Sequence, residues 1–189
     1  MTRDFTHHAS KKENPMNELT HFRRQIDEFM AHHPQSPLDE EQRDNFTGLA
    51  YFEVNGNLVF EVEVERFADD EPVVEMETST GDVRPLRRWG RFHFTVDGQP
   101  ASLTIYFDGH GLFLPFKDAT NGKETYGAGR YLDSHRPGLE QLSVNAIRID
   151  FNYAYNPYCA YSPYYSCPLP PRENWLPVPI RAGERDLSG

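Results

Sequence analysis

The sequence lacks the features that mark a membrane protein, a nucleic-acid binder or a disulfide-rich secreted scaffold. No apolar run approaches the ~20 residues of a membrane-spanning helix, and the chain has only 2 cysteines among 189 residues. Its formal net charge is -10, whereas a protein that contacts nucleic-acid phosphates needs a basic face. The same acidic excess disfavours attraction to an anionic membrane surface. We therefore expect no nucleic-acid partner and no membrane partner.

The N-terminal segment also lacks the apolar core of a secretory signal. Residues 1–16 are polar, and we expect them to be a disordered extension, with Met1 and Met16 both candidate start residues. Residues 17–189 have the length of a single domain and are expected to form one globular β domain. A cytoplasmic location is the default expectation for such a chain, and there the two cysteines are expected to be thiols.

Helical periodicity is confined to the N-terminal part of the chain. Asn17 is a candidate N-cap for a helix to about His33, because the apolar residues between them recur on one face. The proline that follows ends this helix. Ser36 is the candidate N-cap of a second, short helix that ends near Asn45. The sequence thus predicts two helices that pack on a sheet.

From Leu49 onward the apolar residues alternate with polar ones, as they do in strands with one buried face. Asp97 and Gly98 separate two such runs and predict a tight hairpin. The predicted strands are residues 58–65, 74–77, 91–96, 102–107, 112–114 and 144–151. Many short strands with little helix between them favour a mainly β fold, an antiparallel β-barrel or barrel-like meander, because closure removes unpaired edges. A β-sandwich is the alternative.

The C-terminal segment 150–184, here called the strap, is rich in tyrosine and proline. It holds six of the 10 tyrosines and seven of the 15 prolines. A disordered tail is usually poor in aromatic residues, and proline reduces the entropy that a segment loses on ordering. We therefore predict an ordered, extended strap that lies across the sheet.

The strap also carries a family resemblance. It contains NPYCAY at residues 156–161, YSCP at 165–168, EN at 173–174 and AGE at 182–184. In these motifs the chain resembles an uncharacterised prokaryotic family, the domain of unknown function 1684, and the resemblance runs from about Phe22 to Glu184. The family has no established activity, so the resemblance implies membership and no particular reaction.

The 116–133 loop concentrates polar side chains in the middle of the chain. Asp118, Glu124 and Asp133 could bind a cation or act as acid and base, and Arg130 could hold an anionic group. Alternatively, the loop is a glycine-rich turn whose side chains satisfy its own backbone, with Arg130 paired to a carboxylate. The sequence leaves both interpretations open.

The two cysteines, Cys159 and Cys167, lie too far apart in sequence for a zinc-binding pair, and no further ligands stand at a suitable spacing. We therefore predict no metal site. Thiols packed on tyrosine rings, a disulfide between the two residues and a reactive thiol remain alternatives.

We predict a pocket between the 116–133 loop and the strap that binds a small molecule or an ion. One alternative is a hydrolase or transferase that uses Asp118, Glu124 or Asp150 as acid or base, and another is a structural or protein-interaction module. The candidate ligand-binding residues are Arg130, Tyr126, Tyr131, Asp133, Asn152, Tyr155, Asn156, Tyr158 and Tyr161. The identity of a ligand, a cofactor or an oligomeric state does not follow from the sequence.

Overall fold

The structure is a computed structural model that describes residues 15–186. Residues 1–14 of the predicted N-terminal extension lie outside the described part. Its last two residues begin helix α1 (Pro15–His32), which buries Leu19 and Met30. The first helix therefore begins two residues before Asn17, with a proline in the first turn, where a missing N–H costs no hydrogen bond.

Helix α2 (Glu40–Asp44) begins later than the sequence predicts. Its N-cap is Asp39, whose side chain accepts a hydrogen bond from the Gln42 N–H at 2.8 Å. The Gln42 side chain accepts the Asp39 N–H at 2.9 Å, which completes a capping box. Ser36, the predicted cap, instead donates to the carbonyl of Met30 at 2.6 Å and so closes the turn after α1.

The rest of the fold is mainly β and antiparallel, as predicted, with two separately hydrogen-bonded sheets. The smaller sheet has the order β1-β9-β8, and the larger has the order β2-β4-β5-β6-β7 with β3 paired to β4. The strands are β1 (Val59–Glu63), β2 (Glu65–Arg66), β3 (Val74–Glu77), β4 (Val83–Val96), β5 (Gln99–Phe107), β6 (Leu112–Phe116), β7 (Arg130–Asp133), β8 (Leu139–Ser143) and β9 (Ala146–Asp150). Among residues 15–186 the strand pairs form no closed ring, so no closed barrel is found.

The predicted hairpin joins β4 to β5. Asp97 and Gly98 have φ angles of 49° and 78°, the pair of left-handed residues that suits the twist of a two-residue hairpin. The alternation that predicted these strands is also present in burial, since Phe92, Phe94 and Val96 are buried. The periodicity of the sequence therefore located the hairpin and the adjoining parts of both strands, but β4 begins at Val83 and β5 at Gln99, earlier than the predicted residues 91 and 102.

Strands β7 and β8 were not predicted. β7 begins and ends with charged residues, Arg130 and Asp133, in what the sequence suggested was a loop. In β8 only Leu139 is buried, so the strand has almost no apolar face to detect.

Within the described residues, no helix combines the length and apolar character that crossing a membrane requires.

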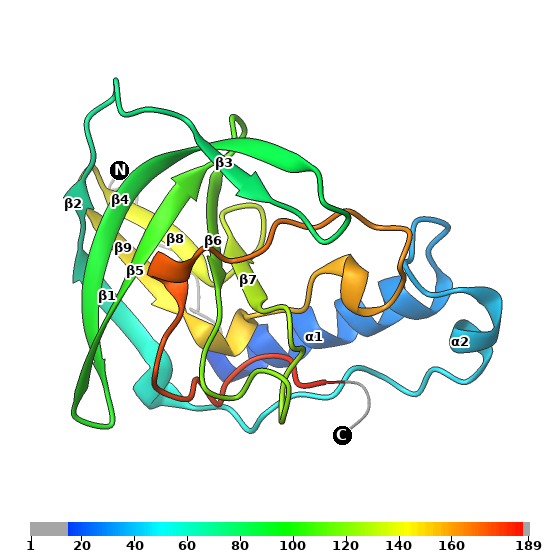
Figure 1. The fold of residues 1–189 in the computed structure, drawn as a ribbon. Helices are drawn as coiled ribbons and strands as arrows, with labels where there is room; N and C mark the ends of the chain where they lie inside the picture. The colour runs from blue at the N-terminus through cyan, green and yellow to red at the C-terminus, as the bar shows by residue number, and fades with distance from the viewer. Residues whose placement is uncertain (1–14, 187–189) are drawn as a thin grey trace, which may run out of the picture.

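The main core lies between the sheets and includes the strap. Buried residues of β4, β5 and β9 form one cluster with Leu176, Val178 and Ile180 of the strap. In Figure 1 the strap, coloured orange to red, crosses β6, reaches β5 at the short helix η4 (Arg172–Asn174) and then turns back toward the C-terminus. The prediction of an ordered strap on the sheet is therefore confirmed.

Candidate functional site

The strap docks on Arg130 at the start of β7. The Arg130 guanidinium has no exposed surface and donates from Nη1 to the carbonyls of Ala182, at 2.5 Å, and Glu184, at 3.0 Å. Its Nη2 donates to the Ile180 carbonyl at 2.6 Å and to Asp118 Oδ2 at 2.9 Å. Burial lowers the pKa of Arg130, and the Asp118 carboxylate opposes that shift. The strap and the 116–133 segment are therefore in contact here, and Arg130, a predicted ligand-binding residue, is buried on the carbonyls of the strap.

The three candidate acids do not meet in one cleft. Asp118 is buried in its ion pair with Arg130. Glu124 lies at the surface and pairs with Arg181 at 2.8 Å. Asp150 accepts the backbone N–H of Asn152 at 3.0 Å and so caps a turn. Each carboxylate therefore has a partner within the fold, and the Asp118–Arg130 pair is the one that the alternative interpretation of the loop named.

Asn152, Asn156 and Tyr161 hold the strap in place. Asn152 exchanges two hydrogen bonds with the backbone of Asn55, at 2.8 and 3.0 Å. The Asn156 N–H and the Tyr161 hydroxyl both donate to Glu184 Oε2, at 2.7 and 2.8 Å. Burial raises the pKa of Glu184 despite these donors. These three predicted ligand-binding residues lie outside the groove described next.

A groove of about 650 Å³ lies beside the strap and β7. Successive strand residues point to opposite faces, so Arg130 is turned into the core while Tyr131 and Asp133 line the groove. Of the predicted ligand-binding residues, Tyr131, Asp133, Tyr155 and Tyr158 line this groove, and Tyr126 and Tyr161 do not. The groove is also bounded by the start of β4, which the sequence did not link to the site.

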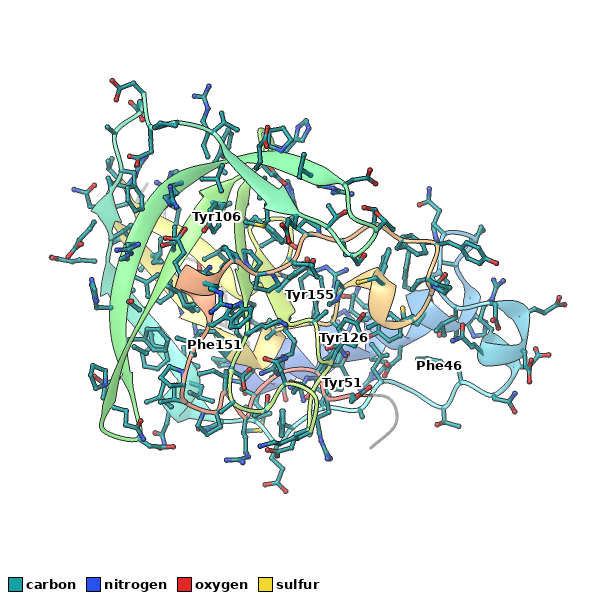
Figure 2. All side chains as sticks on the ribbon, in the orientation of Figure 1. Phe46, Tyr51, Tyr106, Tyr126, Phe151 and Tyr155 are labelled. Carbon is teal, nitrogen blue, oxygen red and sulfur yellow. The ribbon has the colours of Figure 1, made fainter. Side chains whose placement is uncertain are left out.

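One wall of the groove is aromatic. Its rings are those of Phe113, Tyr131, Tyr155, Tyr158 and Tyr165. The Tyr131 and Tyr155 rings meet edge to face at 5.8 Å, and their backbones form an antiparallel bridge. Tyr155 is labelled in Figure 2. Its hydroxyl donates to Asp133 Oδ2, and the Tyr131 hydroxyl donates to the Pro168 carbonyl. Burial raises the pKa of both tyrosines, so these hydroxyls stay protonated at neutral pH.

The charged side chains that line the groove differ in the partners they already have. Asp133 and Asp108 each accept two backbone N–H groups of their own turns through Oδ1. Arg136 lies over the Tyr155 ring at 3.9 Å, and Arg84 donates to a backbone carbonyl at 2.8 Å. Within residues 15–186, neither arginine has a carboxylate within the 4.0 Å of an ion pair. The two arginines are thus cationic groups of the groove that a ligand carboxylate or phosphate could pair with.

The two cysteines meet at the edge of the groove as free thiols, as expected. Cys167 lines the groove, and its Sγ accepts the backbone N–H of Cys159 at 3.3 Å. The Tyr126 hydroxyl lies 3.3 Å from the carbonyl and 3.7 Å from the Sγ of Cys159. No cluster of three or more His, Cys, Asp or Glu side chains suited to a metal ion occurs in the described part of the chain.

Two residues of the EN motif hold the strap against the larger sheet, a role the sequence did not assign. Glu173 accepts hydrogen bonds from Arg88, Arg91 and the Tyr106 hydroxyl, at 3.0, 3.0 and 2.5 Å. Asn174 has no exposed surface and donates to the carbonyls of residues 104 and 115 at 2.8 and 2.7 Å. The sequence signal for this role was an Asn next to a Glu in an apolar, proline-rich segment. Polar residues that are buried in such a segment need specific hydrogen-bond partners.

The groove residues of β4 and of the turn after β7 were also missed. Arg84 lies in β4, His110 lies in the turn between β5 and β6, and His135 and Arg136 follow β7; these three segments are far apart in sequence and share no motif. The one available signal was the dense arginine content of β4 (Val83–Val96) in an otherwise acidic chain.

Comparison with known proteins confirms the family resemblance. The family model described as "Protein of unknown function (DUF1684)" matches residues 44–185, so the match begins later than Phe22. A solution NMR structure of an uncharacterized protein from Haloarcula marismortui is similar, with 35% sequence identity and a TM-score of 0.70. That match covers 94% of this chain and 97% of the other. No curated protein matches the chain.

Proposed function

The chain belongs to the DUF1684 family of proteins of unknown function, and we propose that it binds a small molecule in the groove between β4, β7 and the strap. The ligand combines an aromatic or apolar body with a carboxylate or phosphate group. The observation that carries this proposal is the pairing of an aromatic wall with Arg84 and Arg136, which have no carboxylate partner among the described residues.

The size and chemistry of the groove suit such a ligand. Its volume of about 650 Å³ falls within the range of roughly 300–1,000 Å³ that is usual for small-molecule sites. Tyrosine and phenylalanine rings offer edge-to-face or stacked contacts to a planar body. An arginine guanidinium matches a carboxylate or phosphate with two parallel hydrogen bonds. Because Arg136 already lies on the Tyr155 ring, little side-chain freedom remains to be lost on binding.

The ion-binding and enzymatic alternatives have weaker support. The two groove carboxylates, Asp108 and Asp133, are engaged by backbone N–H groups, which leaves less capacity for a cation. The candidate acids Asp118, Glu124 and Asp150 do not line the groove. A purely structural role of the strap can be tested separately from a role in ligand binding. The strap residues that fix it to the core differ from those that line the groove.

The first test is a thermal-shift screen with pairs of ligands that differ only in the acidic group. Suitable pairs are flavin mononucleotide with riboflavin, adenosine monophosphate with adenosine, and indole-3-acetate with indole-3-ethanol. A ligand at ~100 times its dissociation constant adds ~2.7 kcal/mol of stability, which raises the unfolding temperature by roughly 5–10 °C for a domain of this size. We expect a shift from the acidic member of at least one pair and a smaller shift from its neutral partner. Equal shifts within every pair, or none, would refute the proposal.

A variant series then locates the binding site. Losing a charge-assisted hydrogen bond of ~1.5–3 kcal/mol is expected to weaken binding roughly 10- to 150-fold in Arg136→Ala and Arg84→Ala. Arg148→Ala is the matched control. Arg148 lies on β9, pairs with Glu61 of β1 at 3.9 Å and does not line the groove. Titration calorimetry that finds the same loss in the control would place the ligand elsewhere.

Tyr155→Phe separates binding from a purely structural role of the strap. The substitution keeps the ring under Arg136 and removes the hydroxyl that donates to Asp133. If Tyr155 contributes to the ligand site, the variant folds and binds the identified acid more weakly. If its role is only structural, the variant loses stability and keeps its affinity for that acid.

A further inference from the structure

The strap folds back on itself between its two cysteines. The short helix η3 (Tyr158–Ala160) and a hydrogen bond from the Ser162 N–H to the Tyr158 carbonyl, at 3.0 Å, turn the chain. This turn places Cys167 Sγ 3.3 Å from the backbone nitrogen of Cys159. Since N and Cα are about 1.46 Å apart, the Cys159 Cα lies within about 4.8 Å of that sulfur. The spacing is compatible with the separations found across a disulfide.

Both cysteines are held in place by other parts of the fold. Cys167 donates its N–H to Ser79 Oγ at 3.1 Å, and its carbonyl accepts the Ser79 N–H at 2.9 Å. The carbonyl of Cys159 accepts the Tyr126 hydroxyl at 3.3 Å. The two thiols are therefore aligned by the turn between β3 and β4, by the 116–133 loop and by the strap itself, which are distant in sequence.

The thiols are also within reach of a small molecule. Cys167 is 8% exposed and lines the groove of about 650 Å³. Cys159 is half-buried. Cys159 is therefore the thiol more open to a reagent from solvent, and Cys167 adjoins it at the edge of the groove.

We propose that Cys159 and Cys167 form a redox-active dithiol that reduces a low-molecular-weight disulfide and closes into an intramolecular disulfide. This activity does not depend on the acidic ligand proposed above, because it needs only the two sulfurs and access of the disulfide to Cys159.

The reaction proceeds in two exchange steps. The Cys159 thiolate attacks one sulfur of the disulfide, a protein mixed disulfide forms, and the first small thiolate leaves. Cys167 then loses its proton, its sulfur attacks the Cys159 sulfur, the protein disulfide forms, and the second small thiolate leaves. Two electrons pass from the dithiol to the substrate, the Cys167 proton ends on one released thiol, and the other released thiolate takes a proton from water.

The surroundings assign the attacking role to Cys159. The hydrogen bond with the Cys167 thiol, supported by those from the Tyr126 hydroxyl and Ser79, lowers the pKa of the Cys159 thiol to about 6, although partial burial opposes the shift. The same interaction and burial raise the pKa of Cys167. At neutral pH the first residue is a thiolate and the second a thiol, which is the arrangement that exchange requires.

The stoichiometric test uses the full-length reduced protein and oxidised glutathione. Alkylation followed by mass spectrometry counts the remaining thiols, and a separate assay counts released glutathione. We expect both thiols to disappear together with release of both glutathione molecules per disulfide consumed. Cys167→Ser should retain one glutathione on Cys159, and Cys159→Ser should react more slowly. A wild-type protein that stays reduced in excess oxidised glutathione, or that keeps a glutathione on either cysteine, would overturn the proposal.

The pH profile of alkylation tests the assignment of roles. With wild-type protein and iodoacetamide, the rate at Cys159 should rise with a midpoint near pH 6, whereas an ordinary thiol has a midpoint near ~8.5. After allowance for the weaker nucleophilicity of a low-pKa thiolate, Cys159 should react about tenfold faster than an ordinary thiol at pH 6. Tyr126→Phe should move the midpoint upward. A wild-type midpoint near the ordinary value counts against the assignment, and since no ligand is involved, this outcome is independent of the acid-binding proposal.

Discussion

Replacing Asp118 with alanine removes the carboxylate that faces the buried Arg130 guanidinium. Neither side chain of this pair has exposed surface, and their contact distance is 2.9 Å. Breaking a buried ion pair by deleting one partner typically costs about 3–5 kcal/mol, because the remaining charge cannot recover its hydration. The carboxylate also accepts the backbone N–H groups of Thr120 and Ile180, so the upper part of this range is expected. A loss of this size is a large fraction of the roughly 5–15 kcal/mol that stabilises a typical domain.

Urea unfolding monitored by tryptophan fluorescence and by circular dichroism measures this loss. With a slope near 2 kcal/mol per molar urea, the midpoint should fall by roughly 1.5–2.5 M. Glu124→Ala is the matched control, since Glu124 belongs to the same loop and also pairs with an arginine of the strap, Arg181. That pair lies at the surface, where water and salt screen it, so its midpoint should be almost unchanged.

The comparison decides between two roles for Arg130. If Asp118→Ala lowers the midpoint no more than Glu124→Ala does, the guanidinium must be hydrated or free to turn outward. Arg130 could then serve as an anion-binding residue, as the sequence suggested, and its role as a buried anchor of the strap would be refuted.

Three further predictions concern the strap. Gly183 and Gly122 have nearly equal positive φ angles, 76° and 75°, but a Cβ at Gly183 would lie 2.4 Å from the Ala154 carbonyl oxygen and one at Gly122 meets nothing within 4 Å. Alanine at Gly183 should therefore destabilise the protein in urea by more than the ~1 kcal/mol of backbone strain expected at Gly122. Asn174→Ala should cost about 1–3 kcal/mol for each buried backbone group left unpaired, with no rescue by Asn174→Asp. The raised pKa of Glu184 means that the folded state holds this proton to higher pH than the unfolded state, so its contribution to stability falls as pH rises above ~4.3. Unfolding of Glu184→Gln should lack this fall between pH 4 and 7, and parallel pH profiles for the two proteins would contradict the assignment.

Local sequence patterns were enough to predict the long strands, the hairpin and the ordered strap, because each of these depends on residues close together in the chain. Alternating residues such as Phe92 and Phe94 marked the long strands, because a half-buried strand must alternate wherever it is placed. Asp97 and Gly98 marked the hairpin through the backbone angles they tolerate. The tyrosines and prolines of the strap marked an ordered segment, and its motifs marked the family.

The tertiary structure alone decided which polar residues act together. Arg130 and Asp133 are charged residues of the same predicted loop. In the structure both belong to β7, which directs the Arg130 side chain into the core and the Asp133 side chain into the groove. Arg136 reaches the groove from the turn after β7 and Cys167 reaches it from the strap, and no spacing in the chain relates them. Because a side chain's face and its partners are set by long-range packing, the sequence could supply the chemistry of the site but not its assembly.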